Sequence, residues 1–317
     1  MPAAIAQPQQ AVAQEPIRSS SDLVVLDVSV LDRSGNFVDS LTQNDFEISD
    51  DGNKKQPVFF DSISAPARVA VLVETGPAVY LIHEQHLAAL SSLLEGLAAD
   101  DEAALFTYAQ APRQVVPFTS DKAALLAAVG EPQYTIGMDQ LNFYDSLRAI
   151  VDTLPANPGK KSIVVLSTGL DSSSEDHWAG LEHRLRTANV MVFPVALGGS
   201  LRAPPAAKKS KKKKAQPSSS AGTDAFARAD QALLGLAKIT GGRAYFPKSP
   251  DEFAAAYREI ASVLQHQYIL GITPEHDGAF HKLSVEIVAR ESKQPKRNEK
   301  NPIYRPFYRE GYLAPSP

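Results

Sequence analysis

The sequence contains no cysteine, one tryptophan and three methionines in 317 residues. Without cysteine, the chain has no disulfide framework, no thiolate metal site and no thiol nucleophile. It also has no apolar run of the roughly 18 residues that would span a bilayer. The patterns GxGxxG, GxxxxGKS/T and GxSxG are missing, which excludes the usual phosphate-binding loops and the nucleophile turn of hydrolases. We therefore expect a protein that is not an enzyme and needs no cofactor.

The charge is modest overall but unevenly placed. Hydrophobic residues make up 44% and charged residues 21% of the chain, and the net charge is −4, as in a folded protein of one large or two ordinary domains. Six lysines fall in one short stretch, at Lys208, Lys209, Lys211, Lys212, Lys213 and Lys214. Subtracting their charges leaves about −10 for the rest, so no nucleic-acid-binding body is expected. Ala/Pro-rich and Ser/Pro-rich flanks predict a disordered loop over Leu201–Gly222, which either keeps the chain soluble or contacts anionic surfaces.

The first residues differ in composition from the remainder. Residues 1–20 are rich in Pro, Gln, Ala and Ser without periodicity, which predicts a disordered leader. This stretch has neither the basic region nor the apolar region of a signal peptide. Its small residues resemble the start of an exported chain after signal removal. We expect a secreted or periplasmic protein, with a cytoplasmic one as the alternative.

A small β module is predicted for residues 21–64. Leu23–Leu31 is rich in β-forming residues, and Thr42–Asp45 has the capping-box form of a single helical turn. Phe46–Ile48 then leads into the Asp51-Gly52 pair, a strong hairpin signal. Pro57–Phe60 is predicted to be the returning strand.

Residues 66–265 alternate between strand and helix patterns, which predicts βαβ units around a doubly wound, mainly parallel sheet. The unbroken apolar run Val69–Val73 is typical of a strand buried on both faces. Ala104–Tyr108 is predicted to be the next strand, and Ser162–Ser167 a further buried strand. Apolar residues at helical spacing predict helices, for example over Phe143–Leu154 and Phe253–Leu264.

Three β-like segments follow between residues 266 and 313, at Gln267–Thr273, Lys282–Ala289 and Tyr304–Tyr312. The N-terminal strands alone are too few for a stable sheet, and the C-terminal ones need a partner face. Both ends of the chain are therefore predicted to build one small antiparallel β domain.

The run Val69–Val73 and the loop Glu74–Ala78 after it mark the expected functional edge, because ligands of such sheets bind beyond the carboxyl ends of the strands. This stretch resembles the first strand and loop of a von Willebrand factor A (VWA) domain. From Leu23 to Tyr312 the chain resembles bacterial VWFA-related proteins, in which that domain sits within a β module. His266–Gly271 and Arg309–Tyr312 are among the more specific resemblances. The resemblance implies the VWA fold and a role in protein recognition.

In VWA domains three loops supply oxygen ligands to a divalent ion, at the metal-ion-dependent adhesion site. The resemblance places the equivalent positions of this chain at Glu74, Gly76, Ala78, Leu141 and Thr168. Glu74 keeps a carboxylate where the family has an aspartate. The other four positions lack the family's side chain: Gly76 and Ala78 replace serines, Leu141 replaces a threonine, and Thr168 replaces an aspartate.

These replacements leave two interpretations open. In the first, the metal site has decayed, and Glu74, Asp145 and Asp171 are ordinary loop acids, with Asp145 capping the helix that begins near Phe143. In the second, these three carboxylates bind Mg²⁺ or Ca²⁺ in a new geometry. The first predicts a module that binds an unidentified protein partner without a cofactor. The second predicts metal-dependent adhesion or ligand binding.

Overall fold

The computed structural model describes residues 23–61, 65–80, 83–129, 140–155, 159–175, 178–202, 220–288 and 304–317. The predicted leader at residues 1–20 and the lysines at 208–214 lie outside these residues. None of the helices in the described part of the chain is long and apolar enough to cross a membrane.

A five-stranded sheet with the order β7-β6-β5-β8-β9 forms the centre of the larger domain. Its strands are β5 (Ala67–Glu74), β6 (Glu102–Tyr108), β7 (Pro112–Thr119), β8 (Lys160–Ser167) and β9 (Met191–Ala196). All neighbours run parallel except β7, which lies antiparallel to β6 at one edge. The predicted doubly wound, mainly parallel sheet is therefore confirmed, with the run Val69–Val73 in its central strand.

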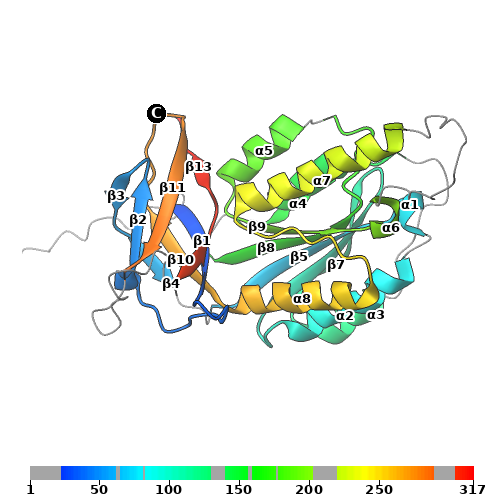
Figure 1. Cartoon of the computed structure of the whole chain (residues 1–317), viewed down its shortest axis with the longest axis horizontal. Helices are drawn as coiled ribbons and strands as arrows, with labels where there is room; N and C mark the ends of the chain where they lie inside the picture. Colours follow the sequence, from blue (N-terminus) through cyan, green and yellow to red (C-terminus); the bar gives the residue numbers. More distant parts are fainter. Residues whose placement is uncertain are drawn as a thin grey trace, which may run out of the picture.

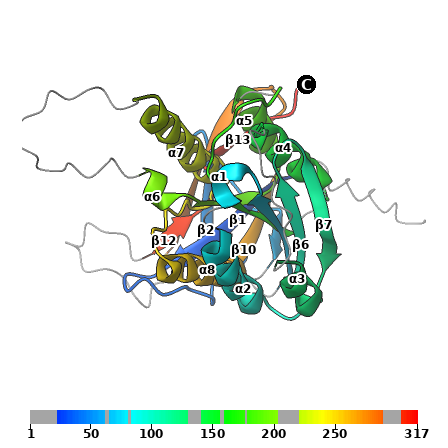
Figure 2. The same cartoon turned by 90° about the vertical axis from the view of Figure 1, so that its right-hand side faces the viewer.

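Helices cover both faces of this sheet (Figures 1 and 2). The helices are α1 (Pro77–Tyr80), α2 (His83–Gly96), α3 (Lys122–Val129), α4 (Phe143–Thr153), α5 (Trp178–Thr187), α6 (Gly199–Arg202), α7 (Ser220–Thr240) and α8 (Pro250–Gln265). Val69, Val71 and Val73 of β5 pack with residues of α2, α3 and α8. Ala70 and Leu72 pack with residues of α4, α5 and α7. Strand alternation thus explains why an unbroken apolar run is needed here: both faces are buried.

The two ends of the chain build the smaller domain, as predicted. One sheet has the order β12-β1-β10-β4 and the other β13-β11-β2-β3. Their strands are β1 (Val24–Leu31), β2 (Phe46–Asp50), β3 (Asn53–Lys55), β4 (Phe59–Asp61), β10 (Gln267–Ile272), β11 (Phe280–Ile287), β12 (Arg305–Phe307) and β13 (Gly311–Leu313), with a short 3₁₀ helix η2 (Gln43–Asp45) between β1 and β2. Side chains of both sheets form one hydrophobic cluster. All pairings in these sheets are antiparallel.

Three boundaries differ from the sequence predictions. The strand that returns from the Asp51-Gly52 turn is β3, while the Phe59–Asp61 segment pairs with β10 in the other sheet. The predicted strand Tyr304–Tyr312 is two strands, β12 and β13, which belong to different sheets. Both ends of the predicted loop Leu201–Gly222 are helical, because α6 extends to Arg202 and α7 begins at Ser220, and residues 203–219 lie outside the described part of the chain.

Arg309, in the crossover from β12 to β13, ties the β domain to the α/β domain. Its buried guanidinium donates to the carbonyl oxygens of Leu185, Arg186 and Ala188 at 3.4, 2.6 and 2.8 Å. These carbonyls lie at the end of α5, where a cation also complements the helix dipole. Gly241, at φ +81°, approaches so closely that a Cβ would meet the Arg309 nitrogen at 2.4 Å. The side chain and backbone of Arg309 are therefore both fixed at the domain interface.

Asp27 of β1 is the buried acid of the same interface. Its neighbours Leu26 and Val28 point into the β-domain core, so strand alternation directs Asp27 away from that core. Burial raises the pKa of the Asp27 carboxyl to about 7, against the opposing charges of Lys161 and Arg309. Its Oδ1 atom has no hydrogen-bond partner among the described residues. A buried acid in this position favours the neutral form.

Asp27→Asn is expected to change how stability depends on pH. Between the ordinary carboxyl pKa of 3.8 and the folded value of about 7, the folded protein holds a proton that the unfolded chain releases. The free energy of unfolding should therefore fall with rising pH by up to about 1.4 kcal/mol per unit across this window and level off above it. The variant lacks this titration, so its stability relative to the wild type should grow from pH 4 to pH 7. Urea unfolding at several pH values measures the slope of unfolding free energy against pH in both proteins. Glu95→Gln, which changes an exposed acid of α2, is the control. Equal slopes in the wild type and Asp27→Asn would contradict the raised pKa of Asp27.

Candidate functional site

Glu74 is the last residue of the central strand and lies in one row with two polar residues. The β5–β6 register pairs Glu74 with Tyr108, and the β5–β8 register pairs Val73 with Leu166, which brings Ser167 beside Glu74. Alternation places all three on the face covered by α4, α5 and α7. The carboxyl ends of three neighbouring strands thus deliver one acid and two hydroxyl groups to the same point.

The Glu74 carboxylate is fully buried, and protein groups hydrogen-bond to both of its oxygens. Thr168 contributes its backbone N–H, 2.7 Å from Oε2, and its hydroxyl, 2.8 Å from Oε2 and 3.0 Å from Oε1. The Ser167 hydroxyl donates to Oε2 at 3.0 Å. The Tyr108 hydroxyl lies 3.0 Å from Oε2 and 2.6 Å from the Ser167 hydroxyl. Donors surround this carboxylate as a buried charge requires.

The electrostatics follow from this enclosure. Burial raises the pKa of the Glu74 carboxyl, and hydrogen bonds from Thr168, Ser167 and Tyr108 oppose the rise. Burial and the nearby Glu74 charge raise the pKa of Tyr108 well above its usual value. The tyrosine therefore stays a neutral donor to the carboxylate.

Arg202, at the end of α6, supplies the positive charge of the site. Its guanidinium donates to the carbonyl oxygens of Thr168 and, at 2.9 Å, Leu197, and it pairs with Asp230 of α7. Burial lowers the pKa of Arg202 to about 10, and the charge of Glu74 opposes that fall. The Arg202 guanidinium thus contacts the backbone carbonyl of Thr168, the residue whose N–H donates to the Glu74 carboxylate.

Leu141 fills the space beside Glu74 that the loop residues leave. A Cβ at Gly76 would meet Leu141 Cδ2 at 2.6 Å and Glu74 Oε1 at 3.7 Å. Leu141 itself is 8% exposed. Gly76 and Leu141 are therefore complementary: the missing side chain of one makes room for the larger side chain of the other. Both positions would offer hydroxyl ligands in a VWA metal site, and here they form an apolar contact.

The other two predicted acids bind loop backbones. Asp171 Oδ1 accepts from the backbone N–H groups of Phe143 and Tyr144 at 2.7 and 3.3 Å, so it caps the N-terminus of α4. Asp145 was predicted to provide that cap, and this prediction is wrong: its Oδ2 accepts from the backbone N–H of Glu175 at 2.8 Å. Asp145 lies in the first turn of α4, but Asp171 of the opposing loop accepts from the free N–H groups of that turn.

The structure does not gather Glu74, Asp145 and Asp171 into a metal-like cluster. Among the described side chains, the one group of three acids or histidines whose ligand atoms converge within 4.8 Å lies elsewhere, in the β domain. The side chain of Ala78 is outside the described part of the chain. Of the remaining positions, Glu74 and Thr168 carry side-chain oxygens, which are hydrogen-bonded to each other, and Gly76 and Leu141 carry none. Two side-chain oxygens at these positions are a poor fit to a hard divalent ion, which takes several oxygen ligands.

Sequence reasoning missed Tyr108, Ser167 and Arg202. Alternation along β6 and β8 could have indicated the face on which the first two lie, but their meeting with Glu74 depends on strand register. Arg202 had no such signal, because it precedes the lysine stretch in a segment predicted to be loop.

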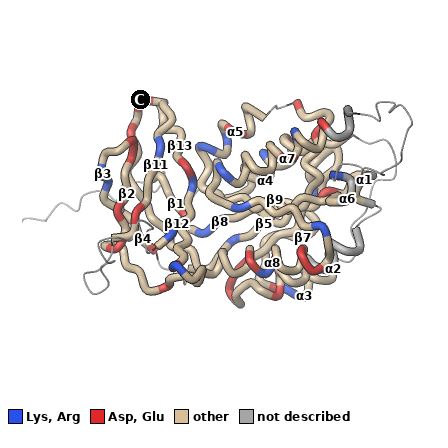
Figure 3. Tube along the Cα trace, viewed as in Figure 1, with Lys and Arg blue, Asp and Glu red and all other residues tan. Residues whose placement is uncertain are grey.

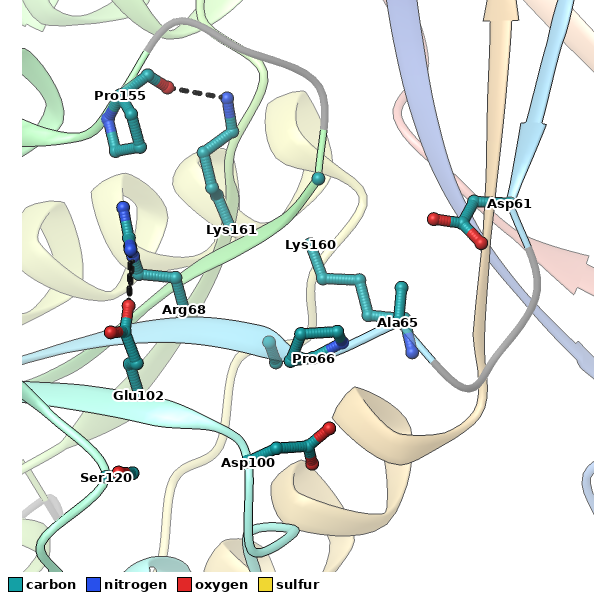
Figure 4. A pocket seen from close by; sticks show the side chains of 12 residues that line it. Asp61, Ala65, Pro66, Arg68, Asp100, Glu102, Ser120, Pro155, Lys160 and Lys161 are labelled. Atoms are coloured by element: carbon teal, nitrogen blue, oxygen red, sulfur yellow. Dashed lines mark hydrogen bonds and ion pairs between the residues drawn. The ribbon is translucent and has the colours of Figure 1, made fainter.

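A cleft of about 630 Å³ lies at the opposite, amino-terminal end of the sheet, between the two domains. Figure 4 shows its charged residues bound within the protein: Arg68 pairs with Glu102, and Lys161 Nζ donates to the Pro155 carbonyl at 2.8 Å. The cleft lies at the end of the sheet opposite Glu74. The carboxyl edge therefore remains the candidate site.

Comparisons with known proteins bear on the fold. No family model matches the chain, and no curated protein matches it. The VWA protein of Catenulispora acidiphila is similar over 94% of this chain and 64% of its own, with 14% identity and a TM-score of 0.44. BatB of Bacteroides thetaiotaomicron is similar over 62% of this chain and 98% of its own, with 13% identity and a TM-score of 0.42. The VWA domain of SpRpn10 is similar over 61% and 94%, with 12% identity and a TM-score of 0.39.

The α/β domain has the architecture that the resemblance to VWA domains predicts. Its sheet is doubly wound with one antiparallel edge strand, and helices pack on both faces.

Gly76→Ala and Leu141→Ala are expected to compensate for each other. Gly76→Ala alone should lower the free energy of unfolding by about 1–3 kcal/mol, because its Cβ collides with Leu141 in a packed site. Leu141→Ala alone should cost about 2–5 kcal/mol by leaving a cavity. The double variant should be more stable than the sum of the two changes predicts, by about 0.5–3 kcal/mol. Urea denaturation of the four proteins measures this coupling, and strict additivity would show that the two residues do not share the space.

Proposed function

We propose that this protein is a non-enzymatic protein-interaction module of the VWA type, in which hydrogen bonds hold the carboxyl-edge site together in place of a divalent ion. The observation that carries the proposal is the Glu74 carboxylate, which is fully buried and accepts from Thr168, Ser167 and Tyr108. A metal ion would have to displace these donors. The loops that hold an ion in VWA domains are instead joined here by their own side chains.

The linked loops support this proposal. Leu141 N donates to the Ser172 hydroxyl at 2.8 Å, and Ser172 N donates to the Leu141 carbonyl at 2.8 Å. Together with the Asp171 and Asp145 contacts, they fix the second loop to the third without a shared ligand. A surface that is preorganised in this way binds a partner at a lower entropic cost. The alternative, metal-dependent adhesion through Glu74, Asp145 and Asp171, has no supporting contact.

The charge distribution favours a protein partner over a nucleic acid. Basic and acidic residues are interspersed along both domains (Figure 3). Nucleic-acid binding needs basic residues gathered on one face, because phosphate contacts supply most of the affinity. The secreted or periplasmic location expected from the N-terminal composition belongs to the same proposal.

Restoring the VWA ligand set tests the role of the filled site. In the wild-type protein, millimolar Mg²⁺ or Ca²⁺ should leave the melting temperature unchanged, because a ligand that binds only the native state must stabilise it. A variant that combines five substitutions should gain a Mg²⁺-dependent rise in melting temperature. The substitutions are Glu74→Asp, Gly76→Ser, Ala78→Ser, Leu141→Thr and Thr168→Asp.

Leu141→Thr alone is the matched control, since it opens the space without supplying the carboxylate at position 168. A rise of several degrees in the wild type, lost in Glu74→Gln, would contradict the proposal and support the metal-dependent alternative. Differential scanning fluorimetry in EDTA and in each ion provides the comparison.

Partner binding should be independent of divalent ions and sensitive to exposed residues of the carboxyl edge. Gln140 and Glu175 are exposed there. Capture of a partner from a lysate of the source organism should be equal in EDTA and in Mg²⁺, and it should weaken in Gln140→Arg and Glu175→Arg. Lys54→Ala, in the β domain, is the control. Capture that requires Mg²⁺, or that ignores both edge variants, would count against the proposal.

A further inference from the structure

A second polar cluster lies in the β domain, where the β2–β3 turn meets β11. Asp50 ends β2 and is 2% exposed, Asp51 is the first turn residue, and His281 of β11 is 7% exposed. His281 Nδ1 lies 2.9 Å from Asp50 Oδ1 and 3.3 Å from Asp51 Oδ2. One atom of each residue lies within 4.8 Å of the others. A ring nitrogen therefore faces two carboxylate oxygens at once.

Groups outside the trio hold each carboxylate in this orientation. Tyr312 OH donates to Asp50 Oδ2 at 2.9 Å, and the backbone N–H of Lys282 donates to Asp51 Oδ1 at 3.0 Å. In each carboxylate, one oxygen thus accepts a hydrogen bond from another strand, and the other oxygen faces His281. Carboxylates that bind metal ions in proteins are commonly hydrogen-bonded in this way.

The other nitrogen of His281 is oriented in the same way. Nε2 lies 3.1 and 3.2 Å from the two oxygens of Asp277, four residues earlier. In the ion-free protein Nδ1 is within hydrogen-bond distance of Asp50 Oδ1. With an ion bound, an Nε2–H donated to Asp277 would leave the Nδ1 lone pair directed at Asp50 and Asp51. A carboxylate behind a histidine is the usual outer partner of a metal-binding imidazole.

We propose that Asp50, Asp51 and His281 bind a divalent transition-metal ion of the zinc type. The ligand set, one imidazole and two carboxylates, suits zinc and its neighbours, while calcium and magnesium take oxygen ligands alone. The two carboxylates balance the charge of the ion. Three protein ligands leave a position for water in a tetrahedral site. The cluster is separate from Glu74 and does not depend on the function proposed for the carboxyl edge.

Binding at this point would fasten the β2–β3 hairpin to β11. Strand β11 lies between β2 and β13 in its sheet, and Tyr312 of β13 reaches the same cluster. An ion that bridges Asp50, Asp51 and His281 therefore links β2 and its turn, from the N-terminal part of the chain, to β11, from the C-terminal part. The proposed role is structural.

Isothermal titration calorimetry with ZnCl₂ on the full chain tests the site. One ion per chain is expected in the wild type. Asp51→Asn should weaken binding by more than about 10-fold, because it removes a charged ligand, while Asn tolerates the positive φ of 47° at this position. Asp277→Asn should weaken it by about 10- to 100-fold through the orientation of His281. Both acids are exposed, so these variants report on binding without opening the core.

Asp32→Asn is the matched control, a partly exposed turn aspartate of the same domain outside the cluster, and it should bind zinc like the wild type. Co²⁺ provides a second readout: the wild type should give visible absorption bands of a low-coordinate site that Asp51→Asn loses. No binding at millimolar zinc would overturn the proposal and leave a protonated His281 that forms ion pairs with its acids. Binding of equal strength in the wild type, Asp51→Asn and Asp277→Asn would also overturn it, by placing the ion elsewhere.

Discussion

A buried carboxylate on the central strand is the constraint on which the carboxyl edge of this protein depends. Glu74 ends a strand whose two faces are covered by helices, so water cannot solvate its charge. A charge in that position is tolerated only if protein groups replace the water. Thr168, Ser167 and Tyr108 do so directly, and Arg202 adds a cation next to the Thr168 carbonyl. Four of these contacts reach Oε2, and the Thr168 hydroxyl also reaches Oε1.

At the other end of the sheet, charged side chains that bind protein groups join the two domains. The C-terminal crossover carries Arg309 and Glu310 in succession. Arg309 donates to the carbonyls that end α5, and Glu310 pairs with Arg186 of α5 and Lys238 of α7 at 3.1 and 3.2 Å. Because β12 and β13 belong to different sheets of the β domain, this short crossover connects both sheets to the helices of the α/β domain.

The fold was largely predictable, because hydrophobic patterns determine it. An unbroken run such as Val69–Val73 has one stable environment, a strand buried on both faces, and the alternation of strands and helices then predicts the doubly wound sheet. The β domain followed from counting strands that lacked a partner. Short segments misled the prediction: pairing of β4 with β10 rather than with β2 depends on tertiary contacts that local turn signals do not encode.

The candidate site was predictable only in part. The chemistry lost at Gly76, Leu141 and Thr168 could be read from the resemblance, but the replacement network could not. Tyr108 and Ser167 are 34 and 93 residues from Glu74, and they meet it through strand register, which hydrophobicity does not specify. Capping of α4 illustrates the same limit: the sequence shows Asp145 in the first turn, while Asp171 reaches the helix from another loop. His281 and Asp50, 231 residues apart, had no local signal at all.

The central claim is that protein donors, and not an ion, satisfy the Glu74 carboxylate. NMR of selectively labelled protein tests it most directly, by following the side-chain carboxyl carbon of Glu74 and the amide proton of Thr168 during a Mg²⁺ titration. The account predicts a strongly hydrogen-bonded, exchange-protected Thr168 amide and no change of either signal in millimolar Mg²⁺. A joint shift of both signals that saturates with Mg²⁺ would contradict it.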